Sequence, residues 1–260
     1  MYDPIRVREI NLLYNDNYFE ENYDQRLVDL WHKDFGKTLP IYIHDIFALG
    51  TPRRGEKVLD IATGYGHLAL HSALAGAQTV AIDYSDTSLR LARQTFEKNM
   101  VDIKLIKMDA TKLDFDDETF DLIYCVHLIE HISQQSVTEC LAEIKRVLKP
   151  NGRLVITTCS NKWHDTIGYK FICLYNKINN RTIIPLDNIH SSGHITKLNP
   201  FTFKHILKQA GFLTTLKIVF NPYERLNTIH KIILATPLKN IFCSNVYALC
   251  TKPRGSEFRH

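Results

Sequence analysis

Short apolar runs alternate with amphipathic segments from about residue 57 onward, and this alternation predicts most of the fold. Five runs rich in Val, Ile and Leu have the length of buried strands: residues 58–61, 79–82, 103–108, 122–126 and 154–158. The intervening segments have helical spacing, clearest at 136–149, where a Ser136-x-x-Glu139 capping box precedes the apolar repeat. The Pro150-Asn151-Gly152 turn, with Gly152 suited to positive φ, then leads into the next strand. The pattern indicates a mostly parallel sheet with crossover helices.

Three segments fall outside this alternation: residues 1–55, 161–198 and an apolar, helix-like stretch at 225–242. We interpret residues 1–252 as one domain, because no linker or repeat divides it. Its predicted parts are a helical cap at 1–55, a core at 56–160, a lid insertion at 161–198 and the C-terminal part of the sheet at 199–252. The tail at 253–260 resembles translated cloning sites, so we interpret it as vector-derived.

Composition narrows the class of protein. Hydrophobic residues make up 45% and charged residues 23%, as in ordinary globular domains. The net charge of +4 is spread along the chain without a long basic run, so we expect no nucleic-acid partner. No apolar run is long enough to span a membrane, and we expect no transmembrane segment. The six cysteines lack C-x-x-C spacing, which favours reduced thiols and a cytoplasmic location.

A carboxylate and a glycine turn follow the first predicted strand. Asp60 is near the end of that strand, and Gly64 and Gly66 allow the backbone to approach a ligand before a helix begins. Asp83 ends the second strand, where an acid can accept both hydroxyls of a ribose, and Asp109 after the third could accept the amino group of adenine. Because parallel strands end at one edge, these residues predict an adenosine-containing ligand.

The same glycines also fit a dinucleotide-binding fingerprint. Residues 64–69 read G-x-G-x-x-A, and Asp83 lies about where that motif expects its acid. A dehydrogenase would not explain Asp60, Asp109 or the turn at 148–152, so we disfavour this alternative.

Five segments together resemble class I S-adenosylmethionine-dependent methyltransferases of the small-molecule type, including the ubiquinone-pathway O-methyltransferases: residues 60–66, 81–85, 107–110, 120–123 and 148–158. The resemblance covers residues 56–160 and makes them the cofactor-binding core. It implies an α/β, Rossmann-like sheet of seven strands in the order 3-2-1-4-5-7-6, with the last strand antiparallel. Residues 212–220 and 245–251 fit the last two strands.

By this resemblance the methyl donor is S-adenosylmethionine and the product is S-adenosylhomocysteine. The implied cofactor-binding residues are Asp60, Ala62, Gly64, Gly66, Asp83, Tyr84, Asp109, Ala110, Cys125, Tyr18 and Tyr23. Ala62 stands where the family often has glycine, and alanine is small enough for the loop to close. Core packing explains Tyr84 or Cys125 as well as ligand contact does. Each cap tyrosine taken singly fits an amphipathic helix on the sheet edge better than it fits cofactor contact.

Residues 127–131 read H-x-x-E-H, a pattern found in zinc proteases. A strand precedes it and Ser133 follows in place of a continuing helix, so we reject a zinc site and expect no metal. Related methyltransferases have a similar Glu-His pair at the mouth of the substrate pocket. The resemblance therefore makes Glu130 and His131 candidate catalytic residues, and His194 a third where the lid returns; His190 is a further candidate base. For each of them a purely structural role stays open.

These residues predict methyl transfer to a small-molecule acceptor by in-line displacement, with oxygen or nitrogen favoured over carbon as the attacking atom. A nucleic-acid methyltransferase is one alternative, but residues 125–128 read Cys-Val-His-Leu where base-modifying enzymes carry an Asn/Asp-Pro-Pro-aromatic motif. A non-catalytic cofactor-binding protein of the same fold is another. The cap and lid helices offer a candidate homodimer contact.

Overall fold

The computed structural model describes residues 14–15, 17–19, 25–159, 163–178, 194–219, 233, 235–243 and 245–254. Their strands are β1 (Lys57–Ile61), β2 (Gln78–Asp83), β3 (Lys104–Lys107), β4 (Phe120–Cys125), β5 (Leu148–Thr158), β6 (Leu213–Val219) and β7 (Asn245–Thr251). They form one sheet in the order β3-β2-β1-β4-β5-β7-β6. β7 runs antiparallel to both β5 and β6. The Rossmann-like sheet implied by the resemblance is confirmed.

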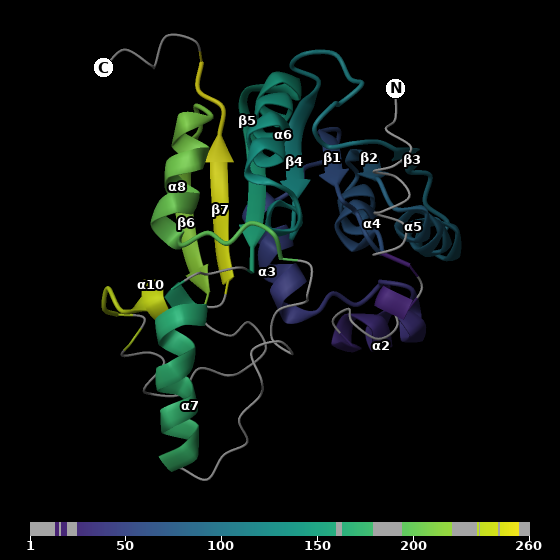
Figure 1. Ribbon diagram of the computed structural model, residues 1–260. Coiled ribbons are helices and arrows are strands. Elements are labelled where there is room, and N and C mark those ends of the chain that lie inside the picture. The colour runs from purple at the N-terminus through teal and green to yellow at the C-terminus, as the bar shows by residue number, and fades with distance from the viewer. Residues whose placement is uncertain are drawn as a thin grey trace.

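The carboxyl ends of β1 to β5 lie at one edge of the sheet, because these strands run parallel (Figure 1). At the end of β1, Ile61 is in register with Ile82 of β2 and with Cys125 of β4. Asp83 at the end of β2 is in register with Lys107 of β3. Residues that immediately follow these strands are therefore brought to the same region.

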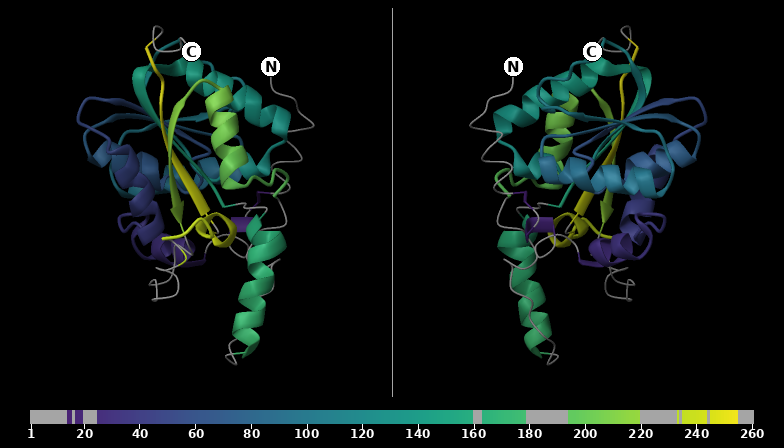
Figure 2. Two further views of the ribbon diagram at one scale, coloured as in Figure 1. Left: turned by 90° about the vertical axis from the view of Figure 1, so that its left-hand side faces the viewer. Right: turned by 90° about the vertical axis from the view of Figure 1, so that its right-hand side faces the viewer.

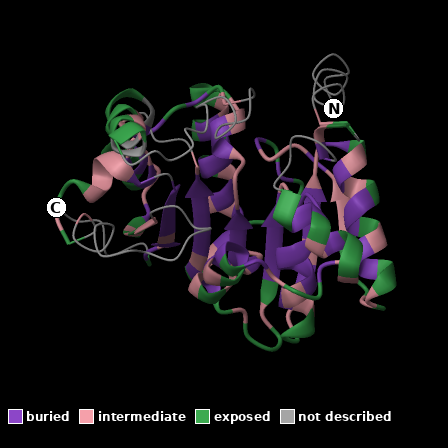
Figure 3. Ribbon diagram, turned by 90° about the horizontal axis from the view of Figure 1, so that it is seen from below, coloured by how far each residue is buried: buried purple, intermediate pink, exposed green. Residues whose placement is uncertain are grey.

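Helices cover both faces of the sheet (Figure 2). The helices in the described residues are α2 (Gln25–Asp34), α3 (Ile41–Gly50), α4 (His67–Leu74), α5 (Asp86–Lys98), α6 (Gln134–Val147), α7 (Tyr169–Ile178), α8 (Pro200–Gln209) and α10 (Lys239–Phe242). Two short turns accompany them, a 3-10 turn η2 (Ile129–His131) and a π-helical turn η3 (His164–Gly168). Alternate β1 residues separate the faces, since side chains point to opposite sides of a strand. Leu59 packs with α6 and α8, whereas Val58 packs with α2 and α3. The central strands β1, β4, β5 and β7 are mostly buried, whereas the edge strands β3 and β6 are more exposed (Figure 3).

The cap helix α2 is held on the sheet by one buried polar chain. Trp31 Nε1 donates to Thr95 Oγ1 over 2.7 Å, and Thr95 Oγ1 donates to the carbonyl of Tyr65 over 2.7 Å. Tyr65 lies in the loop after β1, so the chain links α2, α5 and that loop. A ligand that binds at this loop would therefore lie close to the cap.

The helix predicted at 136–149 is present, but its start was placed wrongly. α6 begins at Gln134, and its N-cap is Ser133, whose Oγ accepts from the Ser136 backbone N–H over 3.1 Å. Both serines are good N-cap residues, so sequence alone did not distinguish them. The helix also ends at Val147, where the backbone becomes extended at Leu148.

Residues 150–152, predicted as a turn before the strand, lie within β5, where its pairing with β4 is irregular, and the residue with positive φ is not the one expected. Asn151 has φ of 60°, whereas Gly152 does not lie in the left-handed region. Asparagine tolerates this conformation better than most residues. Gly152 is needed for space instead, because a Cβ there would lie 2.7 Å from the Lys149 carbonyl oxygen.

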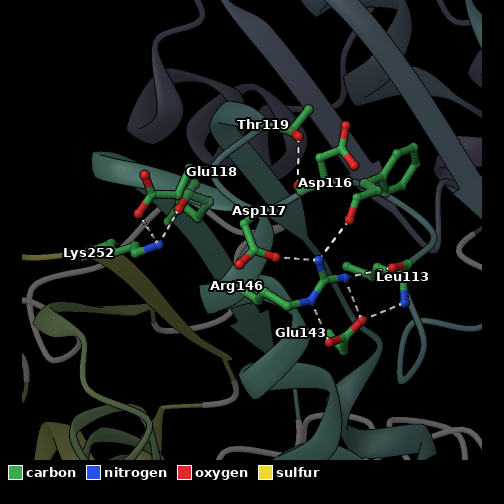
Figure 4. Close-up of polar contacts among 10 residues, drawn as sticks. Leu113, Asp116, Asp117, Glu118, Thr119, Glu143, Arg146 and Lys252 are labelled. Carbon is green, nitrogen blue, oxygen red and sulfur yellow. Dashed lines mark hydrogen bonds and ion pairs between the residues drawn. The ribbon is translucent and has the colours of Figure 1, made fainter.

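Arg146 ties the loop between β3 and β4 to α6 (Figure 4). Its Nη1 donates to the Phe115 carbonyl over 2.7 Å and to Asp117 Oδ1 over 2.8 Å. Its Nη2 donates to the Leu113 carbonyl over 2.7 Å and to Glu143 Oε2 over 2.9 Å. One guanidinium thus satisfies two loop carbonyls and two carboxylates.

We expect Arg146→Ala to lower the free energy of unfolding by about 2 kcal/mol, because hydrogen bonds to charged groups contribute about 1.5–3 kcal/mol and this side chain is only partly screened by solvent. Urea denaturation would measure the change. Lys112→Ala, an exposed residue in the same loop, is the control and should change stability by less than about 0.5 kcal/mol. Equal midpoints for the two variants would contradict the anchoring role.

The division into cap, core, lid and C-terminal part stays a prediction. Part of the lid and half of the 225–242 stretch lie outside the described residues, as do residues 255–260 of the predicted tail. Within the described parts, α7 extends away from the sheet at the carboxyl edge (Figures 1 and 2). None of the described helices has the length and apolar content needed to cross a membrane.

Candidate functional site

The loop after β1 contains three left-handed backbone positions. Ala62, Gly64 and Gly66 have φ of 57°, 53° and 82°. Ala62 adopts a conformation that glycine adopts at lower cost, so the loop closes with alanine there. At Gly66 glycine is also required for space, because a Cβ would lie 2.7 Å from Cε1 of Phe96. Gly66 is the N-cap of α4, so the loop brings a helix N-terminus to the carboxyl edge.

Asp60 connects β1 to that loop and to α4. Its Oδ2 accepts from Thr63 Oγ1 over 2.6 Å and from the Ala69 backbone N–H over 3.2 Å. Burial raises the pKa of Asp60 to about 7, although both hydrogen bonds act in the opposite direction. The carboxyl group therefore holds the loop in place, and its contact with a methionine moiety stays a prediction.

The other two strand-end acids are oriented by backbone donors. Asp83 Oδ2 accepts from the Gly64 N–H and Oδ1 from the Ser85 N–H, each over 3.0 Å. Burial raises the pKa of Asp83. Asp109 Oδ1 accepts from the N–H and the hydroxyl of Thr111 over 2.9 and 2.8 Å. These hydrogen bonds fix the orientation of both carboxyl groups at the ends of β2 and β3.

Three more predicted contacts lie close to these acids. Tyr84 and Ala110 directly follow Asp83 and Asp109 and are partly buried. Cys125 at the end of β4 is fully buried, and its thiol contacts Cys140 of α6 in the core. The Cys125 side chain is thus directed toward α6, so the backbone of Cys125, and not its thiol, is nearer the carboxyl edge of the sheet.

The cap reaches over the same edge through Tyr14. Its carbonyl accepts from Ser85 Oγ over 3.0 Å, and its ring lies 4.8 Å from Tyr18 and 5.8 Å from His131, centroid to centroid. Burial, together with the charges of Glu130 and Asp83, raises the pKa of the Tyr14 hydroxyl. Tyr14 therefore lies between the predicted ribose acid and the predicted catalytic pair. Tyr18 contacts it, whereas Tyr23 lies outside the described residues.

Glu130 joins three separate segments. Its Oε1 accepts from His127 Nδ1 over 3.1 Å, and from the backbone N–H and the thiol of Cys159 over 3.2 and 3.1 Å. Its backbone carbonyl accepts from the Ile195 and Thr196 N–H groups over 2.7 and 3.0 Å. The side chain is fully buried. This arrangement favours a positioning role for Glu130, while its direct catalytic role stays a prediction.

The two candidate histidines meet although 62 residues separate them in the sequence. The rings of His131 and His194 are 4.9 Å apart, centroid to centroid, and His194 Nε2 lies 3.5 Å from Cys159 Sγ. Burial opposes ionisation of Glu130, but the hydrogen bond and charge of His127 and the charge of His131 hold its pKa well below the usual range. A fixed negative charge beside the pair would stabilise an imidazolium. His190 lies outside the described residues.

The zinc-protease interpretation required a helix with two imidazoles on one face. Residues Ile129–His131 form a single 3-10 turn, and His127 lies before it with φ of 53°. Possible metal-ligating atoms nevertheless form two groups, and within each group they lie within 4.8 Å of one another. The first group is His127, Glu130 and Cys159, and the second is Glu130, His131 and His194. These are donors that a zinc-like cation accepts.

Cys159 is the site residue that sequence reasoning missed. It follows β5 directly, and β5 neighbours β4, so the rule that ligand-facing residues follow parallel strands would have selected it. The lone cysteine carried no motif. Tyr14 is not among the cap residues, Tyr18 and Tyr23, that were predicted to bind the cofactor.

The arrangement can hold two chemical groups side by side. The glycine loop and its acids provide hydrogen-bond acceptors at the ends of β1, β2 and β3. The histidine pair consists of His131, which follows β4, and His194, which precedes α8. Tyr14 contacts both halves. A candidate proton acceptor is therefore held next to the predicted cofactor-binding region.

Comparisons with known proteins agree with this geometry. A family model described as a methyltransferase domain matches residues 58–152. A demethylmenaquinone methyltransferase of Renibacterium salmoninarum is 31% identical over 163 residues, which cover 58% of this chain and 65% of that protein. One from Clavibacter sepedonicus is 35% identical over 105 residues, covering 40% and 42%. The chain thus spans less than two thirds of the length of these two relatives.

A third relative is the ubiquinone/menaquinone biosynthesis C-methyltransferase UbiE of Azotobacter vinelandii, which is 29% identical and matches over 62% of this chain and 67% of its own length. Among solved structures, the PH0226 protein from Pyrococcus horikoshii is similar with a TM-score of 0.59 and 18% identity, covering 94% of this chain and 98% of that one. Phosphoethanolamine N-methyltransferase 2 of Haemonchus contortus has a TM-score of 0.60 and 18% identity, covering 92% and 60%. These two likenesses concern the fold.

Proposed function

Because the chain belongs to the class I S-adenosylmethionine-dependent methyltransferases, we propose that it transfers a methyl group from S-adenosylmethionine to a small-molecule acceptor by in-line displacement. The observation that carries this proposal is the contact of Tyr14 with both halves of the site. The Tyr14 carbonyl accepts a hydrogen bond from Ser85 Oγ, two residues after Asp83, and the Tyr14 ring contacts the ring of His131. A donor on the glycine loop and an acceptor at the histidines would therefore be neighbours.

The chain's own residues fit the methyl donor. Glycines shape the loop where a Cβ at Gly66 would collide with Phe96. Asp83 is oriented by the Gly64 and Ser85 N–H groups, one on each carboxylate oxygen, and it lies at the end of β2 where an ionised carboxylate can accept ribose hydroxyls. Asp109, fixed by Thr111, can accept from an adenine amino group. The bound donor supplies a methyl group on a positively charged sulfur, which is already activated toward nucleophiles.

We assign His131 or His194 as the base that takes the acceptor's proton. The attacking lone pair forms the new bond to the methyl carbon, the carbon–sulfur electron pair goes to sulfur, and the proton goes to an imidazole nitrogen. Ionised Glu130 stabilises the imidazolium that results. Apart from that proton transfer, the protein contributes mainly by aligning the two reactants.

Relatives support a quinol-type acceptor. Two are named demethylmenaquinone methyltransferases and one a C-methyltransferase. The expected preference for oxygen or nitrogen over carbon has no support in these names. Deprotonating a phenolic hydroxyl activates both its oxygen and its ring carbons, so the same base serves either outcome.

Two further expectations belong to this proposal. We expect the protein to work in the cytoplasm without a nucleic-acid partner, and a homodimer contact through cap or lid helices stays open to sedimentation analysis. A non-catalytic role is separated from catalysis by product formation: S-adenosylhomocysteine should accumulate with a quinol acceptor. Binding of the donor without any product would favour the non-catalytic alternative.

Donor binding tests the strand-end acids. We expect calorimetry to detect S-adenosylmethionine and S-adenosylhomocysteine but not NAD. Asp83→Ala should weaken donor binding about 10- to 150-fold, because the lost charge-assisted hydrogen bonds are worth about 1.5–3 kcal/mol.

Asp86→Ala is the matched control, since Asp86 is an exposed carboxylate three residues further on that pairs with Lys107. Its affinity for the donor should stay within about twofold of the parent. Asp83→Asn separates geometry from charge by keeping an acceptor in place. Unchanged affinity in Asp83→Ala would move the ribose away from β2, and tight NAD binding alone would overturn the assignment of the donor.

A further inference from the structure

One helix presents an apolar face to solvent beside the candidate site. On α7, Phe171, Leu174 and Ile178 are 57%, 55% and 72% exposed. Leu174 is three residues after Phe171 and four before Ile178, so the three side chains share one helical face. Lys170 and Lys177, both exposed, lie four residues before and three after Leu174 on the same side. We call these five residues the α7 face.

The base of α7 is fixed to the body of the protein. In η3, just before the helix, Gly168 approaches the backbone so closely that a Cβ would lie 2.7 Å from the Ile241 carbonyl oxygen. The ring of Phe171 also contacts that of Phe242, with centroids 6.2 Å apart. From this base the helix extends outward at the carboxyl edge (Figures 1 and 2). A fixed helix with a free outer face can approach a flat surface.

The helix begins next to the segment that carries His194. Trp163 precedes η3, and its ring lies 5.4 Å, centroid to centroid, from that of Phe201 at the start of α8. Residues 194–199 lead directly into α8. A surface bound by the α7 face would therefore lie close to the histidine pair.

We propose that the α7 face docks on an anionic lipid surface. Apolar side chains flanked by lysines are typical of helices that lie in a membrane interface, with the apolar groups at the acyl boundary and the ammonium groups among the headgroups. The helix sequence, residues 169–178, contains two lysines and no acidic residue, which complements negative lipid headgroups. The inference rests on the proposed function, because a quinol-type acceptor partitions into lipid.

A second copy of the chain fits this face less well. Pairing two identical α7 faces about a twofold axis would place Lys170 and Lys177 of one copy near the same residues of the other. Like charges at such a contact oppose association. Lipid headgroups carry the opposite charge and need no matching groove.

The test is flotation of the full chain with vesicles of phosphatidylcholine alone or with an equal part of phosphatidylglycerol. We expect binding to the anionic vesicles that weakens with added salt. Lys170→Gln with Lys177→Gln should reduce it about 25-fold, about fivefold for each lysine. Phe171→Asp with Leu174→Asp should reduce it at least about 100-fold.

Leu74→Asp with Met100→Asp is the matched control. Leu74 is 57% exposed and Met100 92%, and both lie where helices reach the amino edge of the sheet, opposite α7. This variant should bind vesicles like the parent. All variants should bind S-adenosylmethionine equally, which shows that they are folded.

Failure to bind anionic vesicles, or equal binding by the Phe171 and Leu174 variant, would overturn the proposal. So would a stable dimer that this variant dissociates, because a second copy would then cover the face. The proposed function would be contradicted by different results, namely no binding of S-adenosylmethionine or no product with any acceptor. A protein that methylates a short-chain, water-soluble quinol but never binds vesicles would retain the function and lose the lipid contact.

Discussion

Replacing His131 or His194 with alanine is expected to lower turnover about 10²- to 10⁴-fold while donor affinity stays nearly unchanged. Both rings lie in the cluster around Glu130, whereas the donor is assigned to the loops after β1, β2 and β3. Stopped assays for S-adenosylhomocysteine and calorimetry with the donor would measure the two quantities. His205→Ala, an exposed histidine on α8, is the control and should behave like the parent.

The pH profile identifies the base. Because Glu130 keeps its pKa well below the usual range, it stays ionised throughout neutral pH and contributes no limb there. For the parent, kcat/KM should rise with pH over the range in which the base loses its proton. The variant lacking the base should lose that rise. Parent-like rates in both variants would refute the assignment. A loss of kcat/KM that is equal at every pH would show that the residue positions the acceptor and does not act as the base.

A chelator separates proton transfer from metal chemistry. The sequence predicts no metal, yet His131 and His194 share a set of ligand atoms with Glu130. If histidine acts only as a base, dialysis against a chelator should leave turnover unchanged. A loss that added zinc restores would place a cation in this cluster and contradict the metal-free prediction.

Gly66→Ala is expected to lower the free energy of unfolding by about 2–4 kcal/mol. The new Cβ would lie 2.7 Å from Phe96 Cε1, and overpacking a core costs about 1–3 kcal/mol. The φ of 82° adds about 1–2 kcal/mol for a residue with a side chain, offset in part by the lower entropy of alanine in the unfolded chain. Urea denaturation measures the sum, and donor binding should weaken as the loop shifts.

Gly55→Ala provides a close control for this variant. Gly55 has φ of 83°, but a Cβ there meets no described atom within 4 Å. It shares the backbone cost and lacks the collision, so it should lose no more than about 1 kcal/mol. Combining Gly66→Ala with Phe96→Leu should recover part of the loss. Equal destabilisation by the two glycine variants would show that backbone conformation alone explains the effect.

Periodicity was enough to predict the strands and the major helix of the core. Each strand of the predicted set has a counterpart in the sheet, and the buried strands β1, β4 and β5 have the apolar sequences that parallel strands require. Their order came from the resemblance. Helix ends were harder: Ser133 and Ser136 are equally good caps by type, and only packing decides between them.

Site residues could be predicted where a strand position determines them. Asp60, Asp83 and Asp109 lie beside the loops after β1, β2 and β3, so parallel topology alone brings them to one edge. The meeting of His131 with His194 depends on the path of the chain after β5, which local patterns do not encode. Glu130 was recognised by its motif, but its burial and its bond to Cys159 depend on how β4 and β5 end together.

The last strand of the sheet lies in its interior. β7 pairs with β5 on one side and with β6 on the other, so β6 has no contact with the rest of the sheet except through it. During synthesis, β6 and the edge of β5 must wait until residues 245–251 have left the ribosome. Until then the edges of β5 and β6 that pair with β7 are exposed, and unpaired strand edges promote aggregation. Synthesis of β7, and not the pairing of β1 to β5, therefore determines when both of these edges can be paired.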